Sequence, residues 1–351
     1  MLKLLALVLS TAIAQAEALT IEKIGGDISY PWSVSQINDS EVLVTARAGA
    51  LLRINLETGL QRAVKPAPRV ASFRQGGMLD VAYDGETATV YICYSKPAPA
   101  GAGLAIATGQ LEGTELKGLK DIFVSNHSSG SGAHFGCRLV LSGDYLFASL
   151  GDRGDRENSQ DVSNHAGSIL RLNLRTPERA NSRDGWLAEQ YSIGHRNPQG
   201  MALQPETGLL WAHEHGPRGG DEINLIEQNA NYGWPVVSYG KEYVGGAIGL
   251  DYSPEGFKDP LWIWDPSIAP SGMTFYTGDM FPEWQGDLLV GALKFTSIYR
   301  VELDPDTNRP VAQERLFNGD FGRVRDVEMA TDGSVLVLSD APDGGLYRIS
   351  R

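Results

Sequence analysis

The chain has 351 residues, with 30 Lys and Arg against 43 Asp and Glu, which gives a net charge of -13. A surface with this charge repels phosphate backbones and anionic lipids, so the composition argues against a nucleic-acid or anionic-membrane partner. The length exceeds that of an average domain, but all-β propellers reach it as one unit, so two domains are not required.

The first sixteen residues have the pattern of a cleaved export signal. Lys3 provides a positive start, residues 4–13 form a short apolar run, and Ala14-Gln15-Ala16 offers the small-x-small pattern of a cleavage site. The run is too short for a permanent membrane helix. We therefore predict a signal peptide over 1–16, a single domain over 17–351, no membrane insertion, and a periplasmic or secreted mature protein. A buried N-terminal helix is the alternative.

Short runs rich in apolar and β-branched residues recur along the chain between Gly, Asp and Asn, as expected of strands separated by turns. The clearest runs are 41–45, 90–94, 145–149, 287–291 and 334–338. A second run has apolar residues on both sides of a central Arg and occurs at 51–55, 169–173, 298–302 and 346–350, with diverged copies at 104–108 and 222–226. We interpret this second run as a strand that closes most of the units.

These repeats define six units of roughly 45 to 75 residues, a spacing that fits four-stranded blades with loops of variable length. The units begin near Tyr30, Gln75, His134, Asn197, Ser271 and Arg323. A β-helix needs a shorter repeat, and a sandwich would not repeat one strand six times. We therefore predict an all-β fold, a six-bladed β-propeller of four-stranded antiparallel blades.

Two cysteines, Cys93 and Cys137, are present. In an oxidising compartment an even pair far apart in sequence can form a disulfide. The alternative is two separate small buried side chains, because free Cys is among the most buried residue types. The sequence leaves both open.

Four segments combine Gly with charged or hydrogen-bonding side chains near the starts of the units, where loops at one mouth of a propeller converge. They are 74–80, 134–138, 194–201 and 214–224. Their Arg side chains are suited to an anionic cofactor or substrate, since Arg binds carboxylates in a bidentate fork. Their carboxylate and carbonyl oxygens are suited to a hard cation such as calcium.

In order, these segments read Gln-Gly-Gly-Met-Leu-Asp, His-Phe-Gly-x-Arg, Gly-His-Arg-Asn-Pro-Gln-Gly and His-Gly-Pro-Arg-Gly-Gly-Asp-Glu-Ile-Asn. From about Ile24 to the C-terminus the chain resembles the soluble aldose sugar dehydrogenases that depend on pyrroloquinoline quinone (PQQ), the soluble glucose/sorbosone dehydrogenase family. The resemblance implies a quinoprotein oxidoreductase that uses PQQ and calcium to oxidise aldose sugars at C1 to the lactone.

The resemblance also assigns roles to individual residues. His134 is implied to be the general base, a role that suits imidazole because its ordinary pKa lies near neutrality. The residues implied to contact PQQ are Gln75, Arg196, Asn197, Tyr243, Lys294, Arg323 and Arg325. The two-residue spacing of Arg323 and Arg325 directs both to one face of a strand; a pair of solvated surface charges is the alternative.

Two calcium sites follow from the same comparison. The carbonyl oxygens of Gly216 and Pro217 are implied to bind an ion that also contacts the quinone and polarises its reactive carbon. Glu222 and the backbone oxygen of Tyr232 are implied to bind a second, structural ion. Calcium prefers this mixture of carboxylate and carbonyl oxygens.

Two positions depart from the family pattern. Cys137 stands where relatives commonly have Gly, beside the implied base, and it can alter the pocket or tether it to Cys93. Ser168 replaces a Lys, which puts one polar contact in doubt. Neither change removes a group that the implied chemistry requires.

Other interpretations of short patterns are weaker. His213 and His215 flank Glu214, but no third nitrogen or sulfur ligand at a usual spacing completes a zinc site. Arg153-Gly-Asp155 spells an adhesion tripeptide, although a match of three residues arises readily by chance. We expect the acidic loop around it to be an ordinary solvent-facing turn.

Two other function classes fit a propeller with a central ion. A calcium-dependent hydrolase of the lactonase type would use the ion to activate water, but it would leave Lys294, Arg323 and Arg325 without a role. A non-catalytic carbohydrate-binding propeller is the second. For the dehydrogenase, the expected partners are an aldose sugar and an electron acceptor, with the protein a monomer or homodimer.

Overall fold

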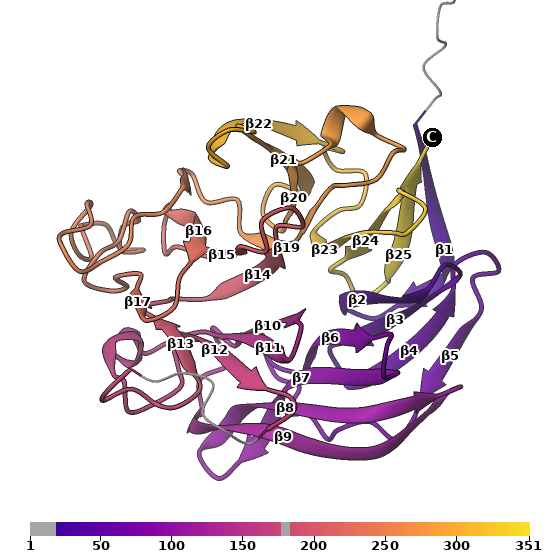
Figure 1. The fold of residues 1–351 in the computed structure, drawn as a ribbon, viewed down its shortest axis with the longest axis horizontal. Coiled ribbons are helices and arrows are strands. Elements are labelled where there is room, and N and C mark those ends of the chain that lie inside the picture. The colour runs from indigo at the N-terminus through magenta and orange to yellow at the C-terminus, as the bar shows by residue number, and fades with distance from the viewer. Residues whose placement is uncertain (1–18, 177–182) are drawn as a thin grey trace, which may run out of the picture.

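The computed structural model describes residues 19–176 and 183–351. Its strands form six sheets around a central axis, and Figure 1 looks down that axis. The six-bladed all-β propeller predicted from the repeats is therefore confirmed. The predicted signal peptide lies outside the described residues. Within the described ranges, no helix is long and apolar enough to cross a membrane.

The strands of the first three blades follow one another in chain order from the axis outward. Blade 1 consists of β2 (Pro31–Asn38), β3 (Glu41–Ala46), β4 (Ala50–Asn55) and β5 (Gln61–Val64). Blade 2 consists of β6 (Met78–Asp84), β7 (Thr89–Ala98), β8 (Gly101–Glu112) and β9 (Glu115–Ser129). Blade 3 consists of β10 (Gly136–Ser142), β11 (Tyr145–Leu150), β12 (Ser168–Asn173) and β13 (Gln190–Ile193), with the short 3₁₀ helix η1 (Arg156–Gln160) in a loop.

The remaining blades repeat this pattern with shorter outer strands. Blade 4 consists of β14 (Pro198–Leu203), β15 (Leu210–Glu214), β16 (Asp221–Ile226) and β18 (Trp262–Trp264). Blade 5 consists of β19 (Pro270–Phe275), β20 (Leu288–Ala292), β21 (Ser297–Leu303) and β22 (Pro310–Leu316), with η2 (Pro282–Trp284) before β20. Blade 6 consists of β23 (Val324–Met329), β24 (Val335–Ser339), β25 (Gly344–Ser350) and β1 (Thr20–Ile28). In one departure from the predicted blade, β17 (Ala230–Asn231) joins blade 3 as a fifth strand, parallel to β13.

The repeated run, with its central Arg in four blades and diverged in two, is the third strand of each blade and not the closing strand that the sequence predicts. It falls in β4, β8, β12, β16, β21 and β25, and a fourth strand covers each of them. Except in blade 3, where β17 lies outside β13, that fourth strand is the edge of the sheet, and in β22 the interior positions are exposed. An edge strand buries little apolar surface, so its sequence lacks the pattern that identifies the inner strands.

The ring closes where the first strand of the chain meets the last. β1 pairs antiparallel with β25, with Ile24 opposite Leu346, and Figure 1 shows the two strands side by side. Ile24 and Ile28 of β1 are buried in a cluster with residues of blades 1 and 6. Blade 6 is thus built from both ends of the described chain, which ties the ring shut.

Each innermost strand has an irregularity in its pairing near its first residues, typical of a β-bulge. The register shifts lie between Pro31 and Ser33 in blade 1 and between Val324 and Asp326 in blade 6, with equivalents in the other four blades. A bulge re-aims the side chains that follow it. The side chains of consecutive residues near the start of these strands therefore lie at two different depths of the central channel.

The lower of these levels is a buried charge cluster, which we call the channel hub (Asp80, Arg138, Asp326). One guanidinium nitrogen of Arg138 lies 3.1 Å from a carboxylate oxygen of Asp80 and 3.1 Å from one of Asp326. Burial raises the pKa of Asp80 to about 6, despite the attraction of Arg138. The hub ties blades 2, 3 and 6 together directly below the mouth.

Candidate active site

Two adjoining cavities open at the mouth of the propeller, where the innermost strands begin. The larger has a volume of about 640 Å³, the smaller about 190 Å³, and both reach Gln75, Asn197 and His215. The predicted site residues that line the larger cavity are Gln75, His134, Arg196, Asn197, Gly216, Pro217, Tyr243 and Lys294. The smaller cavity adds Arg323 and Arg325. The fold therefore gathers residues that lie far apart in the sequence.

His134 forms part of the wall of the larger cavity from the loop before β10. Its Nδ1 lies 2.6 Å from Oδ1 of Asp152, and its side chain is 17% exposed. Its backbone N–H donates to Oε1 of Gln75 at 2.6 Å. Because the carboxylate accepts the Nδ1 proton, Nε2 of the neutral ring keeps a free lone pair. The ring is oriented as a proton acceptor.

Asp152, which the sequence reasoning missed, follows the end of β11. It accepts further hydrogen bonds from the backbone N–H of Gly154 at 2.7 Å and from Nε1 of Trp234 at 2.9 Å. Burial opposes ionisation of Asp152, but the hydrogen bond and charge of His134, the N–H of Gly154 and the charge of Arg196 together lower its pKa. The carboxylate therefore stays ionised and can stabilise a protonated His134.

Arg196 is a buried cation of the larger cavity, with 6% of its surface exposed. It donates to the carbonyl oxygens of His215 at 2.9 Å and Gly216 at 2.8 Å, and its guanidinium lies 5.3 Å from the ring centre of Trp234. Its Nε is buried without a partner among the described residues. The predicted ion ligand Gly216 is thus already a hydrogen-bond acceptor of this arginine.

Arg323 and Arg325 contact the same carboxylate, that of Asp340, at 3.2 Å and 2.9 Å. Burial lowers the pKa of Arg325 despite the attraction of Asp340, and the charges of Arg323 and Arg47 lower it further. Two guanidinium groups that share one carboxylate leave an excess of positive charge. An anionic ligand in the smaller cavity would relieve it.

Other predicted contacts lie at the edges of this arrangement. Asn197 uses its side-chain oxygen to accept the N–H of Gly136 at 3.3 Å, which leaves its amide N–H groups for a ligand. Tyr243 lies at the rim with 69% of its surface exposed, and Lys294 is also exposed. Both side chains are accessible to a molecule that enters the cavity.

A third, very small cavity contains the predicted structural ion ligands Glu222 and Tyr232 next to Glu214, with a volume of about 10 Å³. This volume is close to that of one water-sized sphere. Burial and the negative charge of Glu214 raise the pKa of Glu222 well above its usual range, and Oδ1 of Asn224 is buried without a partner in the described chain. Crowded acceptor oxygens around such a space fit a bound cation.

The two histidines considered for zinc lie in different surroundings. His215 lines both main cavities and donates from Nε2 to the carbonyl of Pro270 at 2.6 Å, while burial lowers its pKa to about 3. His213 is fully buried beneath β14 against Gly200. Within residues 19–176 and 183–351 no three His, Cys, Asp or Glu side chains cluster as a metal site, so backbone oxygens would have to complete any ion site.

The Arg153-Gly-Asp155 segment forms a turn in which Gly154 and Asp155 are exposed, as the sequence predicts for this loop, but the first residue of the tripeptide is not. Arg153 is buried, stacks at 3.3 Å on the ring of Phe135, and donates to the carbonyl oxygens of Ala133 and Ser131. A buried arginine is unavailable to an adhesion receptor. Its role is to support the loop that leads into His134.

Cys93 and Cys137 form a disulfide, with an S–S distance of 2.07 Å. Of the two alternatives left open by the sequence, the structure contains the covalent one, and both residues are also fully buried. Ser168, the other departure, is buried in β12 and accepts from Nε2 of Gln190 at 3.2 Å. It is absent from the lining of both main cavities.

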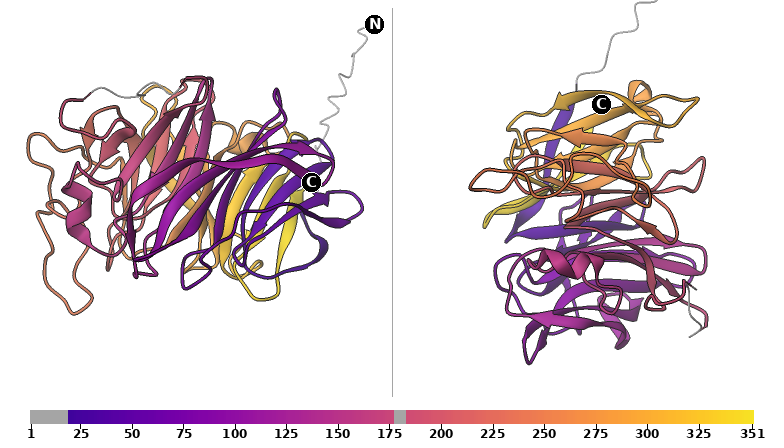
Figure 2. Two further views of the ribbon diagram at one scale, coloured as in Figure 1. Left: turned by 90° about the horizontal axis from the view of Figure 1, so that it is seen from below. Right: turned by 90° about the vertical axis from the view of Figure 1, so that its left-hand side faces the viewer.

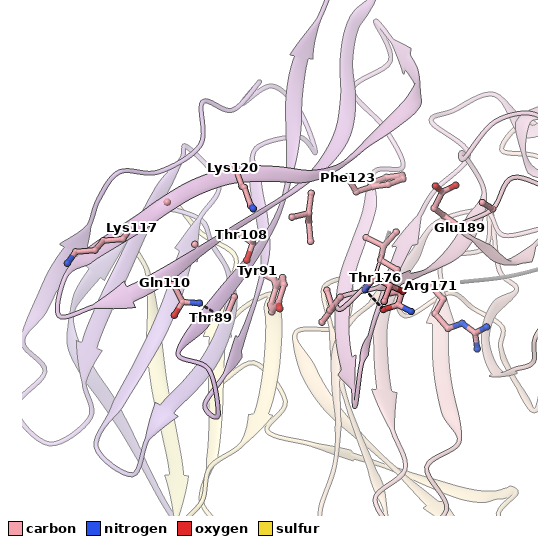
Figure 3. Close-up of a pocket in the computed structure, with 17 residues that line it drawn as sticks. Thr89, Tyr91, Thr108, Gln110, Lys117, Lys120, Phe123, Arg171, Thr176 and Glu189 are labelled. Atoms are coloured by element: carbon pink, nitrogen blue, oxygen red, sulfur yellow. Dashed lines mark hydrogen bonds between the residues drawn. The ribbon is translucent and has the colours of Figure 1, made fainter. Parts of the chain in front are cut away.

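Another large cavity, of about 600 Å³, lies away from the mouth between blades 2 and 3. Figure 3 shows its wall, with Thr89, Tyr91, Thr108 and Gln110 on strands of blade 2 and Arg171, Thr176 and Glu189 on the side of blade 3. None of the four Gly-rich segments contributes to it, and no His lines it. Its charged groups are Lys117, Lys120, Arg171 and Glu189, and it lacks the histidine–carboxylate pair found at the mouth, which is therefore the better candidate for chemistry.

Comparison with known proteins agrees with this geometry. Residues 28–348 match the family model described as "Glucose / Sorbosone dehydrogenase". The chain is 34% identical to the aldose sugar dehydrogenase YliI of Escherichia coli strain K12, over 97% of this chain and 96% of that protein. It is 27% identical to the quinoprotein glucose dehydrogenase B of Acinetobacter calcoaceticus, over 94% of this chain and 87% of that protein.

A solved structure of similar shape is the apo form of the soluble aldose sugar dehydrogenase of Escherichia coli. It superposes with a TM-score of 0.89 at 33% identity, covering 95% of this chain and 99% of that one. Figure 2 shows the propeller of this chain in two side views. The similarity thus spans all six blades. The chain belongs to the glucose/sorbosone dehydrogenase family of sugar oxidoreductases.

Proposed function

We propose that the protein oxidises aldose sugars at C1 to the lactone, with PQQ and calcium as cofactors and His134 as the general base. The observation that carries this proposal is the His134–Asp152 pair in a cavity whose wall also holds Arg196 and Lys294. A base beside a cationic cavity suits the oxidation of a neutral sugar by an anionic acceptor. The quinoprotein among the relatives supports the same choice.

The base performs one half of the oxidation. At C1 the C–H and O–H bonds break and a C=O bond forms, so a hydride and a proton leave the sugar. PQQ, when bound, supplies the carbonyl carbon that accepts the hydride. His134 takes the proton at Nε2, and the ionised Asp152 stabilises the resulting imidazolium.

The cations of the mouth fit the three carboxylates of PQQ. Arg196 and Arg325 each keep a buried Nε without a partner in the described ranges, and Arg323 and Arg325 share one carboxylate. Buried donors without partners are costly, so a ligand that accepts from them is favoured. Gln75, Asn197, Tyr243 and Lys294 would complete the contacts from the wall and rim.

Calcium would occupy two positions in this scheme. The carbonyl oxygens of Gly216 and Pro217 would hold the ion beside the cofactor, where it would act as a Lewis acid. Glu222 and the backbone oxygen of Tyr232 would hold the second ion, in the small cavity next to Glu214. Carboxylate and carbonyl oxygens are the ligands that calcium prefers.

We also propose that the protein is exported, with residues 1–16 as a cleavable signal and 17–351 as one catalytic domain. The apolar run after Lys3 and the Ala14-Gln15-Ala16 pattern support this. The disulfide between Cys93 and Cys137 fits an oxidising compartment. N-terminal sequencing of the secreted protein tests the cleavage site.

The function is tested by reconstituting purified protein with PQQ and calcium and following dye reduction with glucose. We expect sugar-dependent dye reduction only when PQQ is present, together with a change in the absorption spectrum of the bound quinone. A protein that cleaves lactones with calcium alone would be a hydrolase. Binding of sugar without any turnover would make it a carbohydrate-binding propeller.

The structural ion is tested by thermal unfolding of the apo protein with calcium and with a chelator. At a calcium concentration of 100 times the Kd, binding stabilises the folded state by about 2.7 kcal/mol. Glu222→Gln removes a charged ligand and should abolish most of the calcium-dependent shift in Tm. An equal shift in the variant would mean that Glu222 is not a ligand.

A further inference from the structure

The end of strand β7 contacts both segments that flank the base. Cys93 and Ser95 are two residues apart in β7, so their side chains leave the strand on the same side. Cys93 is bonded to Cys137, three residues after His134. Ser95 holds the loop that carries Gln75.

Ser95 is fully buried and forms several hydrogen bonds to that loop. Its Oγ accepts the N–H of Gly77 at 2.7 Å and donates to the carbonyl of Ala71 at 2.8 Å. Its backbone N–H donates to the carbonyl of Gly77 at 2.9 Å, and its own carbonyl accepts the N–H of Ala71 at 2.8 Å. The loop from Ala71 to Gly77 is thus fixed at both ends to one residue.

The segment with the base needs such support, because its backbone is unusual. His134, Gly136 and Cys137 have φ angles of 50°, 64° and 79°. These angles lie in the left-handed region, which is unfavourable for every residue that has a Cβ. Residues persist there only when their surroundings hold them. Gln75 contributes by accepting the N–H of His134, and the disulfide holds the other end of the segment.

We propose that Cys93 and Ser95 act as positioning residues, a bracket that sets the place of His134 relative to Gln75 and the cavity. The inference rests on the proposed function for its kinetic part. Without the disulfide, the segment from His134 to Cys137 can shift relative to the loop of Gln75. A displacement of about 1 Å at a catalytic group can lower turnover by as much as roughly 100-fold.

A disulfide across 44 residues also stabilises the whole protein, so stability and positioning must be separated. The test variant is Cys93→Ala with Cys137→Gly, in which Gly accepts the positive φ while the covalent bond is lost. Ser95→Ala is a second variant that leaves the disulfide in place. The control is Val301→Ala, which removes core volume in β21 of blade 5, far along the ring from the base.

The first readout is kinetic, with enzyme loaded with PQQ and calcium well below the unfolding temperature. We expect kcat of the disulfide variant to fall about ten-fold with KM changed by less than about two-fold. The isotope effect with aldose deuterated at C1 should rise, because the chemical step becomes slower. The control should keep the wild-type isotope effect, since loss of folded enzyme lowers activity without changing the step.

The second readout does not depend on catalysis. Hydrogen exchange of the apo protein should become faster at residues 131–139 in the disulfide variant and stay unchanged there in the control. If the disulfide variant keeps the wild-type exchange rate at this segment, or keeps the wild-type kcat and isotope effect, the proposed positioning role is wrong. If wild-type protein itself does not oxidise aldoses, the proposed function fails, and the exchange data alone decide the inference.

Discussion

The mouth and the channel hub are made from neighbouring residues of the same strands but have opposite charge balance. At the mouth, Arg323 and Arg325 share the single carboxylate of Asp340. One residue further along β23, Asp326 joins Asp80 around the single guanidinium of Arg138. The mouth therefore has unsatisfied positive charge, whereas the hub has excess acid.

Within one sequence motif, some residues therefore belong to the ligand site and others stabilise the fold. The segment from His134 to Arg138 supplies the base with its first residue and the hub with its last. Two carboxylates compensate the charge of Arg138, whereas Arg325 shares its one carboxylate with Arg323. Each of the two buried arginines keeps one guanidinium nitrogen without a partner in the described chain, so the difference between them is one of charge. A buried cation without a full set of counter-charges favours an anionic ligand, whereas one held between two carboxylates ties parts of the fold together.

The largest effect at the mouth is expected from His134→Ala. The loss of the proton acceptor should lower kcat/KM for glucose by roughly 10³-fold, because general bases contribute between about 10² and 10⁴. Binding of PQQ, followed by its absorption, should stay near the wild-type level. The control is His127→Ala, a histidine of β9 that does not line the main cavities. Activity within a few-fold of wild type in His134→Ala would remove this residue from the mechanism.

The largest effect at the hub is expected on stability. Arg138→Met leaves two buried carboxylates without their cation and should lower the free energy of unfolding by about 3–5 kcal/mol. Arg175→Met is the control, because Arg175 and Asp144 form an exposed ion pair and its loss should cost less than about 1 kcal/mol. Denaturant unfolding of both variants measures the difference, and equal losses would refute the contrast.

The inner part of the fold was predictable from sequence because it repeats. The second and third strands of each blade are buried, so their apolar runs stand out, as in β3 and β24. The fourth strands are edges, and β18 has only three residues. The pairing of β1 with β25 joins the ends of the described chain, a contact that no local pattern encodes.

The candidate site was predictable where a motif names a side chain, and not where tertiary structure supplies the partner. His134 and Arg196 lie in recognisable Gly-rich segments and line the cavity as predicted. Asp152 follows a strand without a distinctive motif, and its role is evident only from the distance of 2.6 Å between its Oδ1 and Nδ1 of His134. The loop around Arg153 faces solvent at Gly154 and Asp155, as an acidic Gly-containing loop usually does, but Arg153 itself is buried against Phe135 and two carbonyl oxygens, which no local pattern indicates.

A smaller effect at the mouth is expected from Asp152→Asn. An amide can hold the ring of His134 in place but favours the wrong tautomer and no longer stabilises the imidazolium, so kcat should fall by about 10²-fold. KM for the sugar should change little, which separates this variant from one that disturbs binding. Steady-state kinetics with glucose measures both parameters. Trp234→Phe, which removes only one hydrogen bond to Asp152, should cost less than ten-fold.

The smallest effect concerns Glu328, which lies beside the hub in a cavity with Asp80 and Arg138. Burial, followed by the charge of Asp326, raises its pKa to about 8. A carboxyl group with a raised pKa in the folded state stabilises the fold while protonated, and this contribution is lost as the pH rises through about 8. Glu328→Gln stays neutral, so at pH 8.5 it should be more stable than wild type by roughly 1–2 kcal/mol, a modest value because the side chain is only partly buried. The two proteins should converge near pH 4.5, and a difference in Tm that does not depend on pH would show that folding does not raise the pKa of Glu328.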